Sequence, residues 1–170
     1  MRISVPDYMF SGISEITPEF LKSIGVKALL CDIDNTLVTY DDPTPTKEAL
    51  AFINEMTEAG IKIAFVSNND ENRVSTFNKD LGFAAFPNAK KPIPSNAKKA
   101  MEALGVKKSE TAMLGDQIFT DVWTGRSCGI KTLLVPPIKD KTSLFFRSKR
   151  VLEKPFIALY KSYEKKKGGK

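Results

Sequence analysis

The chain has 170 residues, of which 42% are hydrophobic and 27% charged, and this suits one globular domain with a hydrophobic core. No apolar stretch approaches the roughly 20 residues of a membrane span, and the apolar run at the start is too short for a signal peptide, so we expect a cytoplasmic protein. The net charge of +6 comes from residues 139–170, which carry 11 basic and 3 acidic residues, and the absence of histidine excludes histidine-based triads and histidine-ligated zinc sites within the chain.

Strand-like and helix-like segments alternate along residues 1–138, which is typical of an α/β domain with a parallel central sheet. In chain order we expect a helix at 17–24, a strand at 26–34, a helix at 46–59, a strand at 61–66, a helix at 71–81, a strand at 83–86, a helix at 95–104, a strand at 111–114, a helix at 121–129 and a strand at 130–135. The cysteines, Cys31 and Cys128, show no metal or redox spacing, and we interpret both as reduced and structural.

Cap residues and apolar spacing define the helices more closely. Thr17, Thr46 and Ser95 precede helical patterns and are residue types that favour the N-cap position. In the helix that begins at Thr46, one apolar face is expected to pack on the sheet, and it consists of Ala49, Leu50, Ile53 and Met56.

The basic tail, residues 139–170, also has an apolar pattern. Its apolar residues recur at helical spacing, namely Phe145, Leu152, Phe156, Leu159 and Tyr163. This predicts a basic amphipathic segment, as one helix or as two helices broken near Pro155. Such a segment can lie on an anionic membrane surface, or its apolar stripe can pack on the domain or on a partner subunit.

Polar side chains follow three of the expected strands. Asp32 and Asp34 end the first strand, Ser67 follows the second, and Asp116 follows the fourth. The carboxyl ends of parallel strands form one edge of the sheet, where open α/β proteins bind their ligands, so these residues are expected to converge. Two carboxylates at the end of a buried strand require compensation, and a divalent cation together with proton or nucleophile chemistry provides it.

Further residues suit a phosphate ligand. Ser67 and Asn68 stand at the start of a helix, where a hydroxyl and backbone N–H groups can bind phosphate, and Lys90 or Lys91 could bind a phosphate oxygen from a loop. Taken singly, Ser67 also suits an ordinary turn, either lysine a solvated loop, and Asp121 a helix N-cap. Together with the carboxylates, these residues favour phosphoryl transfer, in which positioning and electrostatic stabilisation supply most of the catalysis.

The order of these motifs resembles that of the haloacid dehalogenase superfamily. The resemblance rests on Asp32-Ile33-Asp34-Asn35-Thr36, Ser67, Lys91 and Gly115-Asp116-x-x-x-Thr120-Asp121, and it covers about residues 26–135. It implies a three-layer, Rossmann-like fold with Asp32 as the nucleophile and Asp34 as the general acid/base. It also implies Mg²⁺ held by the Asp32 carboxylate, the Asp34 backbone carbonyl and Asp116, with Asp121 orienting the metal shell.

The same resemblance identifies the residues that would bind the phosphoryl group. We expect these to be Thr36, Ser67, Asn68 and Lys91, with Lys90 as an alternative to Lys91. Dehalogenases lack the second aspartate, and the pump-type ATPases usually carry Lys-Thr where Ile33-Asp34 stands, so a phosphatase remains.

The spacing of the motifs leaves no room for a cap domain. Only a helix and a strand fit between Asp34 and Ser67, or between Ser67 and Lys91. An open site suits a large substrate or one presented on a surface, although a small metabolite remains an alternative if a neighbouring subunit of an oligomer serves as a lid.

A narrower resemblance extends over most of the chain, including the tail. Residues 29–37, 65–69 and 91–92 and the motif at 115–122 are similar to the YqeG-type capless phosphatases of subfamily IIIA, which are related to mitochondrial phosphatidylglycerophosphate phosphatases. This implies a phosphorylated lipid as substrate and peripheral contact with an anionic membrane. Phosphatases of polynucleotide ends, of proteins or of small metabolites, and a non-catalytic binding module, are the alternatives, with nucleic acid the less favoured partner.

Overall fold

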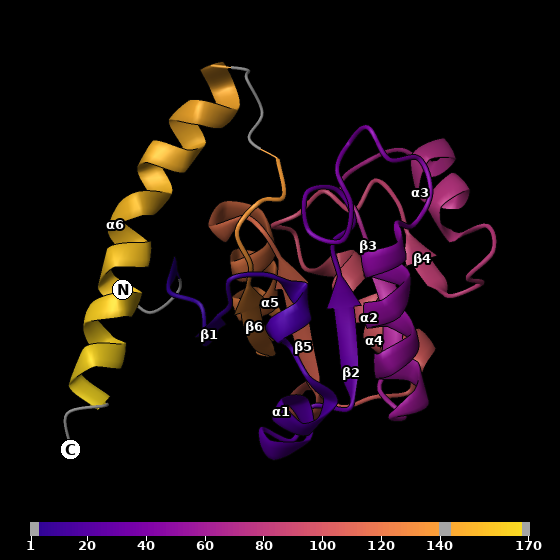
Figure 1. Ribbon diagram of the computed structural model, residues 1–170, viewed down its shortest axis with the longest axis horizontal. Coiled ribbons are helices and arrows are strands. Elements are labelled where there is room, and N and C mark those ends of the chain that lie inside the picture. Colours follow the sequence, from indigo (N-terminus) through magenta and orange to yellow (C-terminus); the bar gives the residue numbers. More distant parts are fainter. Residues whose placement is uncertain (1–3, 140–143, 168–170) are drawn as a thin grey trace.

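The computed structural model describes residues 4–139 and 144–167 and is built around a six-stranded sheet (Figure 1). In spatial order the strands are β1 (Tyr8–Met9), β6 (Lys131–Leu134), β5 (Thr111–Gly115), β2 (Ala28–Cys31), β3 (Lys62–Val66) and β4 (Ala84–Phe86). Every neighbouring pair is parallel, which confirms the predicted sheet. The two-residue edge strand β1 is too short to give a periodic pattern and was not predicted.

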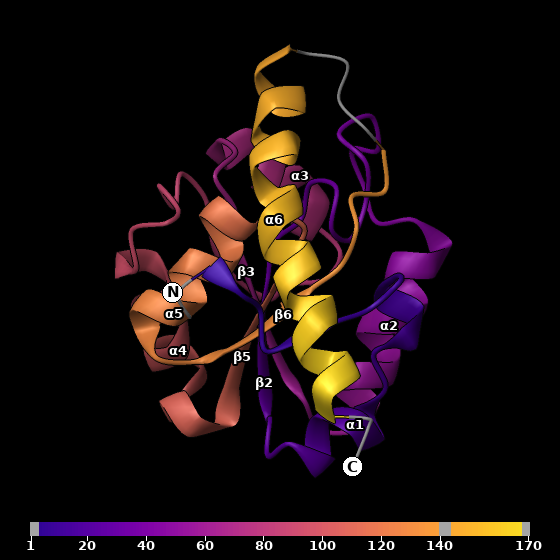
Figure 2. The same ribbon diagram turned by 90° about the vertical axis from the view of Figure 1, so that its left-hand side faces the viewer.

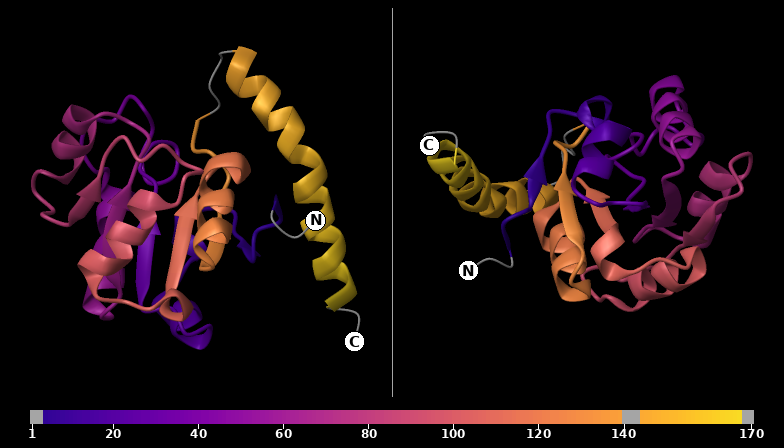
Figure 3. Two further views of the ribbon diagram at one scale, coloured as in Figure 1. Left: turned by 180° about the vertical axis from the view of Figure 1, so that it is seen from behind. Right: turned by 90° about the horizontal axis from the view of Figure 1, so that it is seen from below.

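Helices cover both faces of the sheet and make three layers, as predicted. The helices α1 (Pro18–Ser23), α2 (Lys47–Glu58) and α3 (Glu71–Asn78) contribute buried residues to the core on one face. The helices α4 (Ser95–Leu104) and α5 (Trp123–Cys128) contribute to the core on the other face (Figure 3, right). Side chains alternate along β2, so Leu29 and Cys31 lie in the first core and Leu30 in the second. Short helical turns, η2 (Ile13–Glu15) and η3 (Lys108–Glu110), complete the connections.

The helix caps were predicted in two cases of three. The hydroxyls of Thr17 and Thr46 accept hydrogen bonds from backbone N–H groups three residues further on, at 3.2 Å in both cases. The prediction of Ser95 as a cap was wrong, because Pro94 already has helical dihedral angles and Ser95 is the first residue of α4. Leu50 was also misplaced: it is 37% exposed, and Phe52 is buried instead. The buried face of α2 consists of Ala49, Phe52, Ile53 and Met56, and Leu50 lies on another side of the helix.

The expected absence of a cap domain is confirmed for residues 32–139, all of which the structure describes. Between β2 and β3 there are only a loop and α2, and between β3 and α4 only α3 and β4 with their loops. The carboxyl edge of β2 is therefore left without an inserted domain.

The basic tail forms one helix, α6 (Leu144–Lys167), and the alternative of two helices broken at Pro155 was wrong. A proline removes one backbone hydrogen bond, while the bonds on either side can persist. The helix lies beyond β1, outside the sheet edge (Figures 1 and 2). Among the described residues, none of the helices combines the length and the apolar character that crossing a membrane would require.

The side of α6 that packs on the domain agrees with the predicted stripe at Phe156 but not at Leu152. Phe156 and Ile157 pack against a cluster formed by Ile118, Val122 and Leu134, whereas Leu152 is 61% exposed. The side chains of the other predicted stripe residues Phe145 and Tyr163 lie outside the described part of the chain, and Leu159 is half-buried. The packing face depends on the domain as well as on the tail's own periodicity.

Candidate active site

Asp32 lies at the carboxyl end of β2, at the centre of the site. Asp32 is 7% exposed, and its backbone N–H donates to the carbonyl of Leu114 on β5 at 2.9 Å. One carboxylate oxygen accepts from Lys91 Nζ at 2.6 Å, and the other accepts from the hydroxyl of Thr36 at 3.1 Å. The candidate nucleophile is thus nearly buried and held by two donors, which fix the orientation of its carboxylate.

The surroundings of Asp32 change the pKa of its carboxyl group. Burial raises the pKa of Asp32 from 3.8 to about 6, against the lowering effect of Lys91, while Asp121 and Asp34 add to the rise. For Lys91, burial alone would lower the pKa, but Asp121 and Asp32 together raise it above its ordinary value. Lys91 therefore stays charged, and Asp32 is ionised at neutral pH.

The lysine that enters the site is Lys91, whereas Lys90 is exposed and has a positive φ of 55°. Lys91 Nζ bridges Asp32 and Asp121 at 2.6 and 2.7 Å. The side chain of Asn68 bonds the backbone of Lys91 in both directions, accepting from its N–H at 2.6 Å and donating to its carbonyl at 3.3 Å. The amide of Asn68 thus positions the lysine loop, and any phosphate contact by Asn68 would come from its backbone N–H.

Ser67 is buried at the end of β3, and its hydroxyl accepts a hydrogen bond from the N–H of Asn69 at 3.0 Å. Its own N–H donates to the carbonyl of Phe86 on β4, which fixes the turn beside the site. The structure therefore brings Ser67 to the predicted edge of the sheet, where the hydroxyl also organises the start of α3.

Asp34 is held by two residues that the sequence did not single out. The guanidinium of Arg73, on α3, donates to one carboxylate oxygen through Nε at 3.0 Å and Nη2 at 2.8 Å. The side-chain amide of Asn69 donates to the other oxygen at 3.1 Å. Asp34 is 5% exposed, so this ion pair neutralises a nearly buried charge. Arg73 stands one turn into a helix, and only its place just after the Ser67 turn could have pointed to it.

The loop after Asp34 joins the site to the chain beyond β6. Asn35 has a positive φ of 66°, and its side chain donates to the carbonyl of Lys139 at 2.8 Å and accepts from its N–H at 3.3 Å. The backbone carbonyl of Asn35 accepts from Ile138 at 3.1 Å. Tyr40 is half-buried and lies further along the same loop. Burial raises the pKa of Tyr40 most, and the negative charges of Asp32 and Asp116 raise it further, so its hydroxyl stays neutral. The sequence did not predict the contacts of Asn35 with Lys139 or the place of Tyr40 near the carboxylates.

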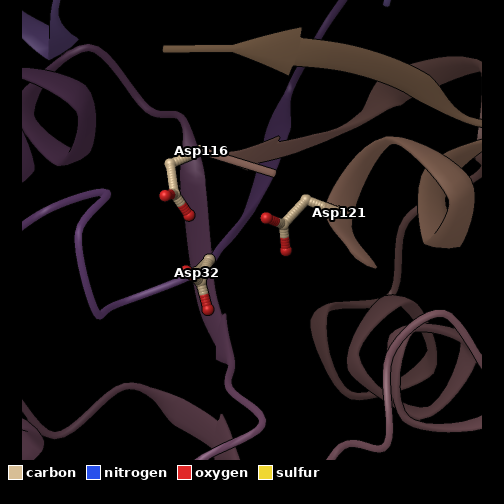
Figure 4. Close-up of side chains that lie close together, drawn as sticks. All are labelled: Asp32, Asp116 and Asp121. Carbon is tan, nitrogen blue, oxygen red and sulfur yellow. The ribbon is translucent and has the colours of Figure 1, made fainter. Parts of the chain in front are cut away.

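Three buried carboxylates form a candidate metal centre. Asp32, Asp116 and Asp121 each place an oxygen within 4.8 Å of the others, and their side chains converge from different elements (Figure 4). Asp121 lies in a π-helical turn, η4 (Ile118–Val122), where its carboxylate accepts from the N–H of Gln117 at 3.1 Å. The turn places Asp121 inside the cluster, whereas the sequence predicted it only as an outer residue that orients the shell.

Gly115 makes this arrangement possible. A Cβ atom at position 115 would overlap the carboxyl group of Asp121, so no other residue type fits without a shift. The glycine that ends β5 thus allows the carboxyl group of Asp121 to approach the end of the strand closely.

The residues present fit the Mg²⁺ that the fold family implies. Oxygen ligands, and carboxylates above all, are those that Mg²⁺ prefers. Three carboxylates and the single ammonium of Lys91 leave two negative charges, which one divalent cation would balance. The Asp34–Arg73 pair is neutral on its own and leaves this balance unchanged.

Known proteins with similar sequences and structures place the chain in a family. The model of the haloacid dehalogenase-like hydrolases matches residues 15–129. A Bacillus subtilis protein named "Probable phosphatase YqeG" is 37% identical over 160 residues, which cover 94% of this chain and 93% of that protein. An Arabidopsis thaliana protein named "Phosphatidylglycerophosphate phosphatase 1, chloroplastic/mitochondrial" is 26% identical over 177 residues, which cover 95% of this chain and 49% of that protein.

A solved structure supports the fold. The crystal structure of an uncharacterized protein from Listeria monocytogenes serotype 4b aligns with a TM-score of 0.56 at 18% identity, covering 69% of this chain and 85% of that one. The family match covers more than half of the chain, and the Bacillus relative is similar over nearly its whole length. The predicted fold and the predicted enzyme class, a phosphatase-type hydrolase, are therefore confirmed, and the chain belongs to the haloacid dehalogenase-like hydrolase family.

Proposed function

We propose that the chain is a Mg²⁺-dependent phosphomonoester hydrolase that acts through an aspartyl-phosphate on Asp32. The observation that carries this proposal is the set of contacts around Asp32: an oriented, nearly buried carboxylate beside Lys91 and two further acids. Bound to Asp32, Asp116 and Asp121, with the backbone carbonyl of Asp34 as a further ligand, Mg²⁺ would supply positive charge next to the transferring phosphoryl group.

In the first step, a carboxylate oxygen of Asp32 attacks phosphorus and the bond from phosphorus to the ester oxygen breaks. Asp34, which at rest is a carboxylate paired with Arg73, takes up a proton from solvent before this step and gives it to the departing oxygen, so that an alcohol leaves. Lys91 and the hydroxyls of Thr36 and Ser67 would bind the phosphoryl oxygens, because they are cations or donors at the same edge of the sheet.

In the second step, Asp34 takes a proton from water, and the water oxygen attacks phosphorus. The bond between phosphorus and Asp32 breaks, which releases inorganic phosphate and restores the carboxylate. Arg73 and Asn69 hold Asp34 in place through both steps, and the two aspartates keep separate tasks because each has its own partners.

We infer further that the substrate is a phosphorylated lipid such as phosphatidylglycerophosphate. The Arabidopsis relative carries that substrate in its name, although this chain spans only about half of its length. The absence of an inserted cap between residues 32 and 139 suits a substrate presented on a surface. The basic residues of the tail suit a peripheral contact with anionic lipid, at roughly 1 kcal/mol for each basic residue near the surface.

A phosphate-release screen tests this function. The full chain with Mg²⁺ would be offered phosphatidylglycerophosphate in vesicles, sugar phosphates, nucleotides, 5′-phosphorylated oligonucleotide and phosphopeptide. We expect release from the lipid, dependent on Mg²⁺ and lost in Asp32→Asn, with the exposed Asp80→Asn as the matched control that keeps activity. Turnover confined to soluble esters would refute the lipid substrate, and no turnover of any phosphomonoester would refute the enzyme mechanism.

A further inference from the structure

A cavity of about 690 Å³ lies between α6 and the β1–β6 edge of the sheet. Its lining is mostly apolar and includes Met9, Phe10, Leu134 and Ile157. A volume of this size lies within the range of roughly 300–1,000 Å³ found for small-molecule sites. The cavity separates the tail helix from the domain along part of its length (Figure 2 shows the helix that forms this wall).

The cavity borders the candidate active site at one shared residue. Asp116 lines it, and the same residue belongs to the cluster with Asp32 and Asp121. A molecule bound at this cluster therefore lies one residue, Asp116, away from an apolar space. From there the walls run over the ends of β6 and β1 to α6.

The outer wall is held in place by contacts that reach the site. Glu153, 2% exposed on α6, accepts a hydrogen bond from the N–H of Ile118 at 2.8 Å, at the first residue of η4. The hydroxyl of Tyr160 accepts from the N–H of Met9 at 3.2 Å, and Phe156 packs edge-on against Phe119. These contacts fix α6 on both sides of the cavity, so its width is set by the fold.

The charges around the cavity favour an uncharged, apolar occupant. Lys154 and Lys161 are exposed at its border, and the exposed Glu15 offsets one of these two charges. The buried acid of the wall, Glu153, already accepts a backbone hydrogen bond. Among the described lining residues, the interior thus offers apolar contact, which suits hydrocarbon, while the cations available to the second phosphate of phosphatidylglycerophosphate are Lys154 and Lys161 at the border.

The geometry points to a subsite for an alkyl or acyl chain: the cavity under α6 receives the hydrocarbon of a phosphomonoester whose phosphate is held at Asp32. This inference rests on the proposed function and deepens it, since it locates the residues that recognise the apolar part of the substrate. A ligand that fills the subsite buries hydrocarbon, and each methylene removed from water strengthens binding by about fourfold.

Calorimetric titration with alkylphosphonates tests the subsite, because their carbon–phosphorus bond is not an ester and the readout is binding. The full chain with Mg²⁺ would be titrated with ethyl-, butyl-, hexyl- and octylphosphonate. We expect the Kd to fall by roughly threefold to fourfold for each methylene until the cavity is filled. A Kd that does not change with chain length would overturn the inference.

Substitutions in the cavity wall test whether the dependence on chain length arises in this cavity. Ser11 is exposed and lines the cavity, so Ser11→Trp should fill it and remove the dependence on chain length while leaving ethylphosphonate binding unchanged. Lys161→Trp, from the opposite wall, should do the same and serves if the first variant does not fold. Ser23→Trp, on exposed α1 surface, is the matched control and should keep the dependence. An unchanged dependence in both cavity variants would overturn the location.

The two proposals fail in different ways. If binding depends on chain length but no alkyl phosphate is hydrolysed, the hydrolytic function is wrong and the subsite stands. If ethyl and octyl phosphate are hydrolysed with the same kcat/KM, and phosphonate binding ignores chain length, the subsite is wrong and the hydrolytic function stands.

Discussion

The buried carboxylate of Asp32 should destabilise the Mg²⁺-free protein, so Asp32→Asn should abolish activity and at the same time raise stability. Burial raises the pKa of Asp32 from 3.8 to about 6 in the folded protein. Between about pH 4 and pH 6 the folded state consequently binds more protons than the unfolded state. Because the unfolded chain releases its proton first, the free energy of unfolding decreases as the pH rises through this window and then stays low.

The size of the effect follows from the two pKa values. They differ by about 2, and one pKa step corresponds to about 1.4 kcal/mol, so ionised Asp32 lowers the free energy of unfolding by about 3 kcal/mol above pH 6. Asparagine has the same shape without the charge, and Lys91 keeps its ion pair with Asp121 in the variant. For a domain of this length about 3 kcal/mol corresponds to roughly 6–12 °C in Tm.

Thermal unfolding followed by circular dichroism from pH 4 to pH 8, in EDTA, measures this difference. The Tm of Asp32→Asn should match that of the wild type near pH 4 and exceed it increasingly up to pH 6, while the exposed Asp80→Asn should follow the wild type throughout. Mg²⁺ should stabilise the wild type more than the Asp32→Asn variant, since the Asp32 carboxylate is a proposed ligand of the ion. Asp32→Asn unfolding at or below the wild-type temperature at pH 7 in EDTA would refute the reasoning.

Three further substitutions test the surrounding structure. Gly115→Ala places a methyl group against the Asp121 carboxyl, so we expect about 1–3 kcal/mol of destabilisation and weaker Mg²⁺ binding, measured by Mg²⁺-dependent shifts in Tm. Glu153→Ala leaves the first N–H of η4 without its acceptor and should lower the free energy of unfolding, measured by chemical denaturation, by about 1–3 kcal/mol. Glu153→Gln keeps an acceptor and should be more stable than Glu153→Ala. Equal stabilities of these two variants would contradict the role of the hydrogen bond. Arg73→Ala leaves the nearly buried Asp34 unpaired and should lower the unfolding free energy by about 3–5 kcal/mol and reduce kcat, and a kcat like that of the wild type would contradict the positioning role.

The convergence of the site could be predicted because it follows from backbone topology. Buried apolar runs identify the strands, and parallel strands bring their carboxyl ends to one edge whatever the packing details. Asp32, Ser67 and Asp116 therefore lie at one edge of the sheet, as expected. Asp121 was predicted near the site, but its place inside the carboxylate cluster depends on a π-helical turn, which has no simple sequence pattern.

Features that depend on tertiary contacts could not be predicted. In α2 the apolar residues are compatible with more than one helical phase, and the sheet selects the one that buries Phe52 and exposes Leu50. The face of α6 is chosen by η4 and β1, which lie far away in the sequence. Arg73 resembles any surface arginine of a helix until Asp34 is placed beside it.

In the proposed mechanism, Asp32 and Asp34 give one short motif two functions. Both are nearly buried aspartates, two residues apart at the end of one strand, and their chemistry is identical in the unfolded chain. Asp32 shares a lysine with Asp121 in a cluster that keeps two excess negative charges, which supports the proposal that Asp32 binds a cation and attacks the phosphoryl group. Asp34 has an arginine of its own and an amide on its other oxygen, so its charge is balanced without a metal and its carboxylate is held in a fixed orientation. The proposed division between nucleophile and proton carrier therefore follows from partners that β3, α3 and the lysine loop supply. Replacing Arg73 should consequently impair proton transfer while leaving in place the carboxylates that are proposed to bind Mg²⁺.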